Sequence, residues 1–221
     1  MQKITKRIVL GTAQLGMDYG ITNRVGKPSL KNGCKIIQAA WESGVRYFDT
    51  AQGYGNSENI LGIALNRLGV ADKAFVISKM PGQLNSTNES EVLRSIDKTI
   101  NALKSRYLYG LLLHNPLNLV LCDRKTERII KNIRNEGLVK KFGISVYRYQ
   151  DAIKAMDFDC FDIIQMPFNI FDQAYYSKGI FRKAEKRNKI VFLRSIFLQG
   201  LLLMDIEDIP FKQRYLSLIH I

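Results

Sequence analysis

Cysteine is scarce in this sequence, and its distribution excludes two classes of small protein. The 221 residues include three cysteines that stand far apart, namely Cys34, Cys122 and Cys160. Their odd number and their spacing exclude a disulfide scaffold and a zinc ribbon, and they suit a reducing compartment. We therefore expect a cytoplasmic protein.

Long apolar segments are also missing. No apolar stretch follows the charged N-terminus, so the sequence shows no secretory signal. The longest apolar run, residues 190–204, is too short to span a bilayer and contains Arg194 and Gln199. We expect no membrane partner.

Acidic residues are the minority among the charges, with 20 Asp and Glu against 33 Lys and Arg, which gives a net charge of +13. A basic chain can bind nucleic acid or other anions. The densest basic cluster, residues 178–189, has helical spacing and contains one aromatic residue, Phe181, whereas a surface on which bases stack needs several interleaved ones. We therefore expect a solvated helix face and no nucleic-acid partner.

Hydrophobic periodicity predicts seven strands that alternate with helices. No linker rich in proline, glycine or serine interrupts the pattern, so we expect one domain over residues 1–221. The expected strands are residues 7–10, 45–48, 74–77, 109–113, 139–144, 161–166 and 190–193. The expected helices are residues 30–43, 57–68, 89–103, 123–136, 151–156 and 172–187. The buried face expected for the first helix comprises Ile36, Ile37, Ala40 and Trp41.

Strands that alternate with helices at a period of about 30 residues predict an α/β fold with a parallel sheet. The period fits both an open doubly wound sheet and a (β/α)8 barrel. A dinucleotide-binding doubly wound sheet carries a glycine fingerprint after its first strand, and the spacing of Gly11 and Gly16 does not match it. A barrel also brings the polar residues that follow the strands to one mouth, so we favour a barrel.

Four of these polar residues suggest proton transfer: Asp49, Tyr54, Lys79 and His114. Each alone has an ordinary explanation, as a helix cap, a surface aromatic, a paired lysine or a buried histidine. Together they are a chemical set, because an ammonium beside a tyrosine favours the phenolate and an aspartate can hold that ammonium in place. A histidine can donate a hydrogen bond to a carbonyl oxygen. Such a tyrosine can move a proton near neutral pH, and hydride transfer would need a nicotinamide cofactor.

The same residues lie in motifs that resemble those of the aldo-keto reductase family, along the whole chain. Residues 48–58, Phe-Asp-Thr-Ala-Gln-Gly-Tyr-Gly-Asn-Ser-Glu, resemble the family's DTA-x-x-YG-x-SE motif. Residues 77–79 resemble its lysine strand and residues 111–116 its histidine strand. Two further segments of the family are matched by residues 137–145 and 164–169.

The resemblance implies a (β/α)8 TIM barrel that reduces the carbonyl group of a small aldehyde or ketone with NADP(H), or alternatively with NAD(H). It implies a catalytic tetrad in which Tyr54 is the general acid, Lys79 tunes it, Asp49 pairs with the lysine and His114 orients the carbonyl. The residues implied to bind the cofactor are Gly11, Thr12, Asp49, Ser145, Gln165, Arg194, Ser195, Phe197 and Gln199. We expect no metal site.

Two positions depart from the family pattern. Val146 stands where the family has an asparagine that contacts the nicotinamide carboxamide. Arg194 replaces the aromatic residue that stacks under the nicotinamide, and a planar guanidinium can also stack. Residues 194–200 resemble a bacterial subgroup associated with surface-sugar biosynthesis, which suggests a sugar-type carbonyl substrate.

The length is the largest departure. Members of the family continue with a further helix, an eighth strand and a segment that binds the cofactor's 2′-phosphate, so we expect an incomplete barrel of seven strands, truncated at its C-terminus. The last six residues match one reading frame of a transposon-end sequencing adapter. Residues 216–221 are therefore a candidate non-native tail, the alternative being the start of the next helix.

Two other functions stay open at this point. One is a Schiff-base lyase or aldolase on the same fold, with Lys79 as the nucleophile. The other is an inactive or regulatory barrel that senses the cofactor without catalysis.

Overall fold

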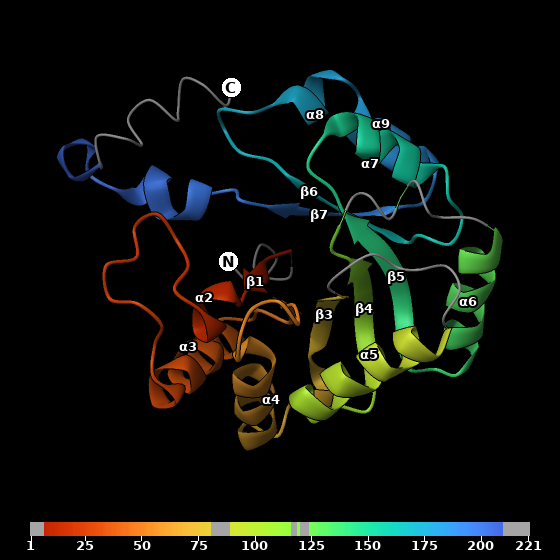
Figure 1. The fold of residues 1–221 in the computed structure, drawn as a ribbon. Helices are drawn as coiled ribbons and strands as arrows, with labels where there is room; N and C mark the ends of the chain where they lie inside the picture. The colour runs from red at the N-terminus through yellow and green to blue at the C-terminus, as the bar shows by residue number, and fades with distance from the viewer. Residues whose placement is uncertain (1–6, 81–88, 116–118, 120–123, 210–221) are drawn as a thin grey trace.

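Short apolar runs of the sequence form a single parallel sheet. The computed structural model describes residues 7–80, 89–115, 119 and 124–209, and within them a sheet of seven strands curls into a nearly closed barrel (Figure 1). Each strand lies within two residues of an expected one at its start. The strands are β1 (Val9–Gly11), β2 (Tyr47–Asp49), β3 (Phe75–Met80), β4 (Leu108–Leu113), β5 (Val139–Ser145), β6 (Ile163–Pro167) and β7 (Ile190–Arg194).

The order of the strands decides between the two expected architectures. Strands that are neighbours in the sheet are also neighbours in the sequence, from β1 through to β7, and every pair is parallel. A doubly wound sheet reverses its strand order at a switch point. The sequential order is that of a barrel, with β1 and β7 at its two ends. The expectation for residues 216–221 falls outside the described residues.

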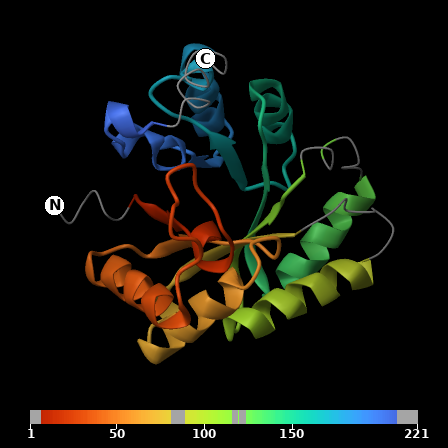
Figure 2. The ribbon, with the colours of Figure 1, turned by 60° about the vertical axis from the view of Figure 1, so that its left-hand side comes forward.

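Helices surround the strands on the outside, as Figure 2 shows from α3 (orange) through α6 (green) to the C-terminal helices (blue). The expected helix stops at Gly69 and Gly137 are confirmed, and both glycines have a positive φ. The helices are α2 (Ala13–Gly16), α3 (Leu30–Glu42), α4 (Ser57–Arg67), α5 (Glu89–Leu103), α6 (Arg124–Asn135), α7 (Tyr149–Met156), α8 (Ala174–Ser177) and α9 (Ile180–Lys186). Short 3₁₀ turns occur at Ala71–Lys73, Leu198–Leu203 and Ile206–Asp208.

One helix that the sequence predicted as continuous is divided in two in the structure. Residues 172–187 form two helices, α8 and α9, because Gly179 adopts a left-handed conformation with φ of 68° between them. Such a residue cannot continue a right-handed helix, and glycine is the residue that adopts it without steric cost.

Two apolar layers flank the strands. The outer layer lies between strands and helices and includes Phe48 and Ile96, both fully buried. The inner layer is centred on Ile77, Leu112 and Ile163, which are also fully buried and form a cluster of their own. Complete burial of each such side chain stabilises the fold by about 1.5–3 kcal/mol. The inner cluster fills the barrel and forms the floor beneath its mouth.

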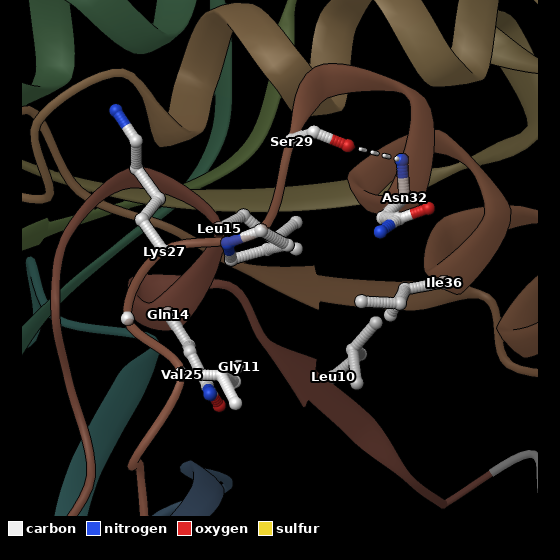
Figure 3. Close-up of a pocket in the computed structure, with 11 residues that line it drawn as sticks. Leu10, Gly11, Gln14, Leu15, Val25, Lys27, Ser29, Asn32 and Ile36 are labelled. Atoms are coloured by element: carbon white, nitrogen blue, oxygen red, sulfur yellow. Dashed lines mark hydrogen bonds between the residues drawn. The ribbon is translucent and has the colours of Figure 1, made fainter.

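The face of α3 differs from the expectation at one position. Ile37 is fully buried as expected, whereas Ile36 is 45% exposed. Ile36 lines a cavity of about 510 Å³ together with Leu10 and Leu15 (Figure 3). The helix turns Ile36 toward the outer side of β1, where the described residues leave a hollow.

Candidate active site

The polar residues at the barrel mouth lie on the same inward face of their strands as the apolar residues of the inner layer. Three of them stand two residues after a member of the inner cluster, in the pairs Ile77 and Lys79, Leu112 and His114, and Ile163 and Gln165. Side chains two residues apart on a strand share a face. Local periodicity therefore turns these side chains inward, above the apolar floor.

Lys79 and Asp49 form a buried ion pair. The Lys79 ammonium donates to both carboxylate oxygens of Asp49, at 2.7 and 2.8 Å, and to the carbonyl oxygen of Thr50 at 2.9 Å. Lys79 is 1% exposed. All three ammonium protons are used, and breaking a buried pair of this kind costs about 3–5 kcal/mol. The mouth thus holds a fixed, compensated cation.

Tyr54 contacts both this cation and His114. The Lys79 Nζ atom lies 4.8 Å from the centroid of the Tyr54 ring, and the His114 ring packs edge-on against Tyr54 with centroids 5.8 Å apart. Burial lowers the pKa of His114 below 6.5, the positive charge of Lys79 lowers it further, and Asp49 opposes both effects. His114 is therefore neutral at neutral pH and has one N–H to donate.

The loop that carries Tyr54 rests on the end of α2. A Cβ atom on Gly16 would overlap the Tyr54 carbonyl oxygen and crowd the backbone nitrogen of Ser57. Gly55 has a φ of 56° and lies against the carbonyl of Gly16 in turn. Two glycines thus allow the close approach that sets the height of Tyr54 over the mouth.

A second carboxyl group is buried behind the site. Ser78 and Thr99 donate hydrogen bonds of 2.6 and 3.1 Å to one oxygen of Glu58, which is 6% exposed. Burial raises the pKa of Glu58, and the two hydroxyl hydrogen bonds oppose the shift. Sequence reasoning placed Glu58 in a motif without assigning it a role.

Among the described residues, the side chain of Gln165 has an acceptor atom without a hydrogen-bond partner. Its amide nitrogen donates to Asp49 at 3.1 Å, and its Oε1 atom is buried without a hydrogen-bond partner in the described part of the chain. The reverse amide orientation would face oxygen toward the carboxylate, so the contact with Asp49 fixes the orientation. Ser145 is in register with Gln165 and buried. Val146 belongs instead to the outer apolar layer and is fully buried there.

The two candidate cofactor residues after β1 differ in exposure. Gly11 is exposed and also lines the cavity of Figure 3. Thr12 is fully buried, and its hydroxyl donates to the backbone carbonyl of Asp49 at 3.0 Å. The Ser57 hydroxyl donates a hydrogen bond of 2.7 Å to the Thr12 hydroxyl oxygen. The Thr12 side chain therefore ties β1 to β2 and to the start of α4.

Arg194 ends β7 and is half-buried. Its guanidinium donates to the carbonyl of Val146 at 3.2 Å and to the Ser195 hydroxyl at 3.5 Å. The guanidinium carbon lies 4.4 Å from the centroid of the Tyr147 ring. Arg194 thus stacks on an aromatic residue of this chain that follows β5.

The loop after β7 has an unusual backbone. Ser195, Leu198 and Gln199 all have positive φ, at 60°, 48° and 57°. Such conformations are uncommon outside glycine and concentrate at functional sites. The expected cofactor residues Phe197 and Gln199 are exposed on this loop, Phe197 by 57%.

Sequence reasoning missed two tyrosines near the mouth. Burial raises the pKa of Tyr19, and Tyr54, Arg194, Tyr147 and Lys79 all act on it electrostatically. Tyr147 is the ring beneath Arg194. Tyr19 belongs to no expected strand or motif, so no local signal could have placed it, whereas Tyr147 comes three residues after the fifth expected strand.

The residues described hold no group of three or more metal-binding side chains, and no helix among them is long and apolar enough to cross a membrane.

Comparison of this chain with known proteins places it in one family. A model described as the aldo/keto reductase family matches residues 7–214. Pyridoxal 4-dehydrogenase of Microbacterium luteolum is 27% identical, over 87% of this chain and 67% of that protein. The aldo-keto reductase YhdN of Bacillus subtilis is 26% identical, over 76% of this chain and 51% of that protein. This chain thus spans about two thirds of the length of the first relative and about half of the second.

Solved structures of low sequence identity share the fold. An aldo/keto reductase from Klebsiella pneumoniae, in complex with NADP and acetate, has a TM-score of 0.72 at 18% identity and covers 90% of this chain and 67% of its own. Glycerol dehydrogenase of Gluconobacter oxydans has a TM-score of 0.69 at 24% identity and covers 91% of this chain and 63% of its own.

Proposed function

This chain belongs to the aldo/keto reductase family, and from that premise we propose that it reduces the carbonyl group of a small aldehyde or ketone, with Tyr54 as general acid. The observation that carries the proposal is the buried pair of Lys79 and Asp49 against the Tyr54 ring. A compensated cation next to a phenol stabilises the phenolate that remains after the phenol gives up its proton. The hydroxyl of Tyr54 would protonate the carbonyl oxygen.

His114 would orient that carbonyl. Its lowered pKa keeps the imidazole neutral, so its single N–H can donate to the carbonyl oxygen without competing as an acid. The edge-on contact with Tyr54 supports two donors that converge on one oxygen atom. Lys79 and Asp49 would hold the charge balance while the proton leaves Tyr54.

The residues present fit a nicotinamide cofactor, and we propose NADP(H). The buried Oε1 atom of Gln165 lacks a partner among the described residues, and a carboxamide N–H₂ group is the donor that such an atom needs. Ser145 offers a hydroxyl beside it. Structures of similar fold that contain NADP or NADPH support this choice. When bound, the reduced nicotinamide would supply the hydride.

Arg194, Ser195, Phe197, Gln199, Gly11 and Thr12 are proposed to contribute to the same cofactor site. Two features of the loop after β7 support a binding role. Its residues with positive φ are of a kind that concentrates at functional sites, and its exposed Phe197 side chain offers an apolar surface. A sugar-type carbonyl is the substrate that the resemblance of residues 194–200 suggests.

The contacts of Lys79 weigh against a Schiff-base lyase. A nucleophilic lysine must lose its proton and present a free amine. The Lys79 ammonium donates all three of its protons in hydrogen bonds, two to Asp49 and one to Thr50. An ammonium so tied suits an electrostatic role better than bond formation.

The test is Tyr54→Phe. We expect NADPH oxidation with a panel of aldehydes and ketones to fall by about 10²- to 10⁴-fold, which is the usual contribution of a general acid. Cofactor binding, measured by NADPH fluorescence, should stay unchanged because the ring remains in place. Tyr176→Phe is the matched control, since Tyr176 is 69% exposed on α8 and should not affect the rate. Reduction by Tyr54→Phe at the wild-type rate, or no reduction by the wild type with any carbonyl, would contradict the proposal.

A further inference from the structure

Among the described residues, the Arg194 cation at the barrel mouth has no anionic partner. No carboxylate among the residues that the structure describes lies within ion-pair distance of its guanidinium, whereas the neighbouring cation Lys79 is paired with Asp49 at 2.7 Å. Half-buried charges are costly unless they are compensated. Arg194 is therefore a charge that a ligand could compensate.

The guanidinium is held in a fixed plane with donors to spare. A guanidinium has five N–H donors, and the bonds to Val146 and Ser195 use two of them, which leaves three without a partner among the described residues. The Tyr147 ring supports one face at 4.4 Å. A fixed planar fork with free N–H groups is the geometry that binds carboxylate or phosphate through two parallel hydrogen bonds.

Arg194 and the reacting groups lie at the same mouth of the barrel, because Arg194 pairs in register with Pro167, two residues beyond the pair of Phe192 and Gln165. The charge of Arg194 lowers the pKa of His114 and opposes the rise in the pKa of Tyr19. The strand period gives the same placement, because Arg194 follows two residues after Phe192, which packs against the inner cluster. Arg194 therefore ends β7 on the inner face of the barrel, at the same mouth as Tyr54 and His114.

We propose that Arg194 binds an anionic group of the substrate, a carboxylate or a phosphate, so that this reductase prefers anionic carbonyl compounds to neutral ones. The inference rests on the proposed carbonyl reduction and names its substrate class. It assigns Arg194 a contact with the substrate in addition to the stacking under the nicotinamide that the family pattern implies. The aromatic ring already on one face of the guanidinium, together with the free edge donors, favours the substrate contact.

A matched pair of aldehydes tests the charge preference without any variant. The pair is 4-formylbenzoate and 4-formylbenzamide, which differ in charge at nearly constant shape. We expect calorimetric dissociation constants of the 221-residue chain to favour the benzoate by about tenfold or more, both without cofactor and with NADP⁺, because a charge-assisted bidentate contact is lost with the amide. Equal affinities, or no binding of either aldehyde, would overturn the proposal.

Three variants assign the preference to Arg194. Arg194→Met should abolish it, and Arg194→Lys should keep part of it through charge alone. Arg182→Met is the control, because it removes the same charge from an exposed position on α9 and should keep the full preference. Retention of the preference in Arg194→Met would overturn the proposal. A loss of NADP⁺ affinity in that variant with the preference intact would assign Arg194 to the cofactor instead.

Two further measurements separate the possible sources of failure. Glyceraldehyde 3-phosphate against glyceraldehyde, in the same titration, tells whether phosphate or carboxylate is the better anion. Reduction of the neutral 4-formylbenzamide reports on the proposed carbonyl reduction itself. Turnover of the neutral aldehyde with no charge preference would overturn the role of Arg194 and leave the reductase assignment standing. A charge preference in binding that Arg194→Met abolishes, without turnover of either aldehyde, would support the role of Arg194 and contradict the proposed carbonyl reduction.

Discussion

The carboxyl group of Glu58 is buried behind the barrel mouth, where the hydroxyls of Ser78 and Thr99 donate to it. Burial raises its pKa above the ordinary value of 4.5. Between the two values the folded chain keeps a proton that the unfolded chain has lost. The contribution of Glu58 to the free energy of unfolding is therefore fully present below pH 4.5 and is lost as the pH rises through the folded-state pKa.

Glu58→Gln should flatten this pH dependence, because an amide imitates the protonated carboxyl and does not titrate. Urea unfolding from pH 4.5 to pH 8 should show the variant gaining stability relative to the wild type as the pH rises. The exposed Glu136 provides the control, and Glu136→Gln should follow the wild-type curve. A Glu58→Gln curve parallel to that of the wild type would mean that folding does not raise the pKa of Glu58.

At the scale of elements, the contact between α2 and the loop before α4 sets the position of Tyr54. Gly16→Ala would push a methyl group into the Tyr54 carbonyl. We expect it to lower the rate of carbonyl reduction by more than tenfold, since misplacement of a catalytic group by about 1 Å can cost 10²-fold. Gly53→Ala lies in the same loop, where a Cβ would meet no atom of the described residues within 4 Å, and it should leave the rate unchanged. Equal rates for the two variants would show that this contact does not position Tyr54.

At the scale of the whole molecule, the two end strands of the described sheet, β1 and β7, each have a neighbouring strand on one side only. β1 has three residues, and all five residues of β7 are half-buried, whereas five of the six residues of β3 are buried. Amide protection follows burial and hydrogen bonding on both sides of a strand. Hydrogen exchange followed by mass spectrometry should therefore find β1 and β7 faster than β4 and β5 by about tenfold or more. Protection of β1 and β7 equal to that of β4 would show that both ends are covered in solution.

The sequence by itself determined the strands, most helix ends and the inward direction of the residues at the mouth. These features depend on neighbours in the chain, because a period of two residues carries Ile77 to Lys79 and Ile163 to Gln165 on one face of a strand. Its errors were also local. The left-handed Gly179 divides the expected helix over residues 172–187, and Ile36 faces a cavity instead of the core.

The tertiary structure decided how the polar groups meet, including contacts beyond the pair of Asp49 and Lys79 that the resemblance implied. Asp49 contacts both Lys79, which is 30 residues later, and Gln165, which is 116 residues later, because the barrel curves strands β2, β3 and β6 around one axis. Tyr19 reaches the mouth from a loop without periodic pattern. The stack of Arg194 on Tyr147 likewise depends on where two separate loops end. Contacts of this kind follow from the closure and register of the sheet, which no short stretch of sequence encodes.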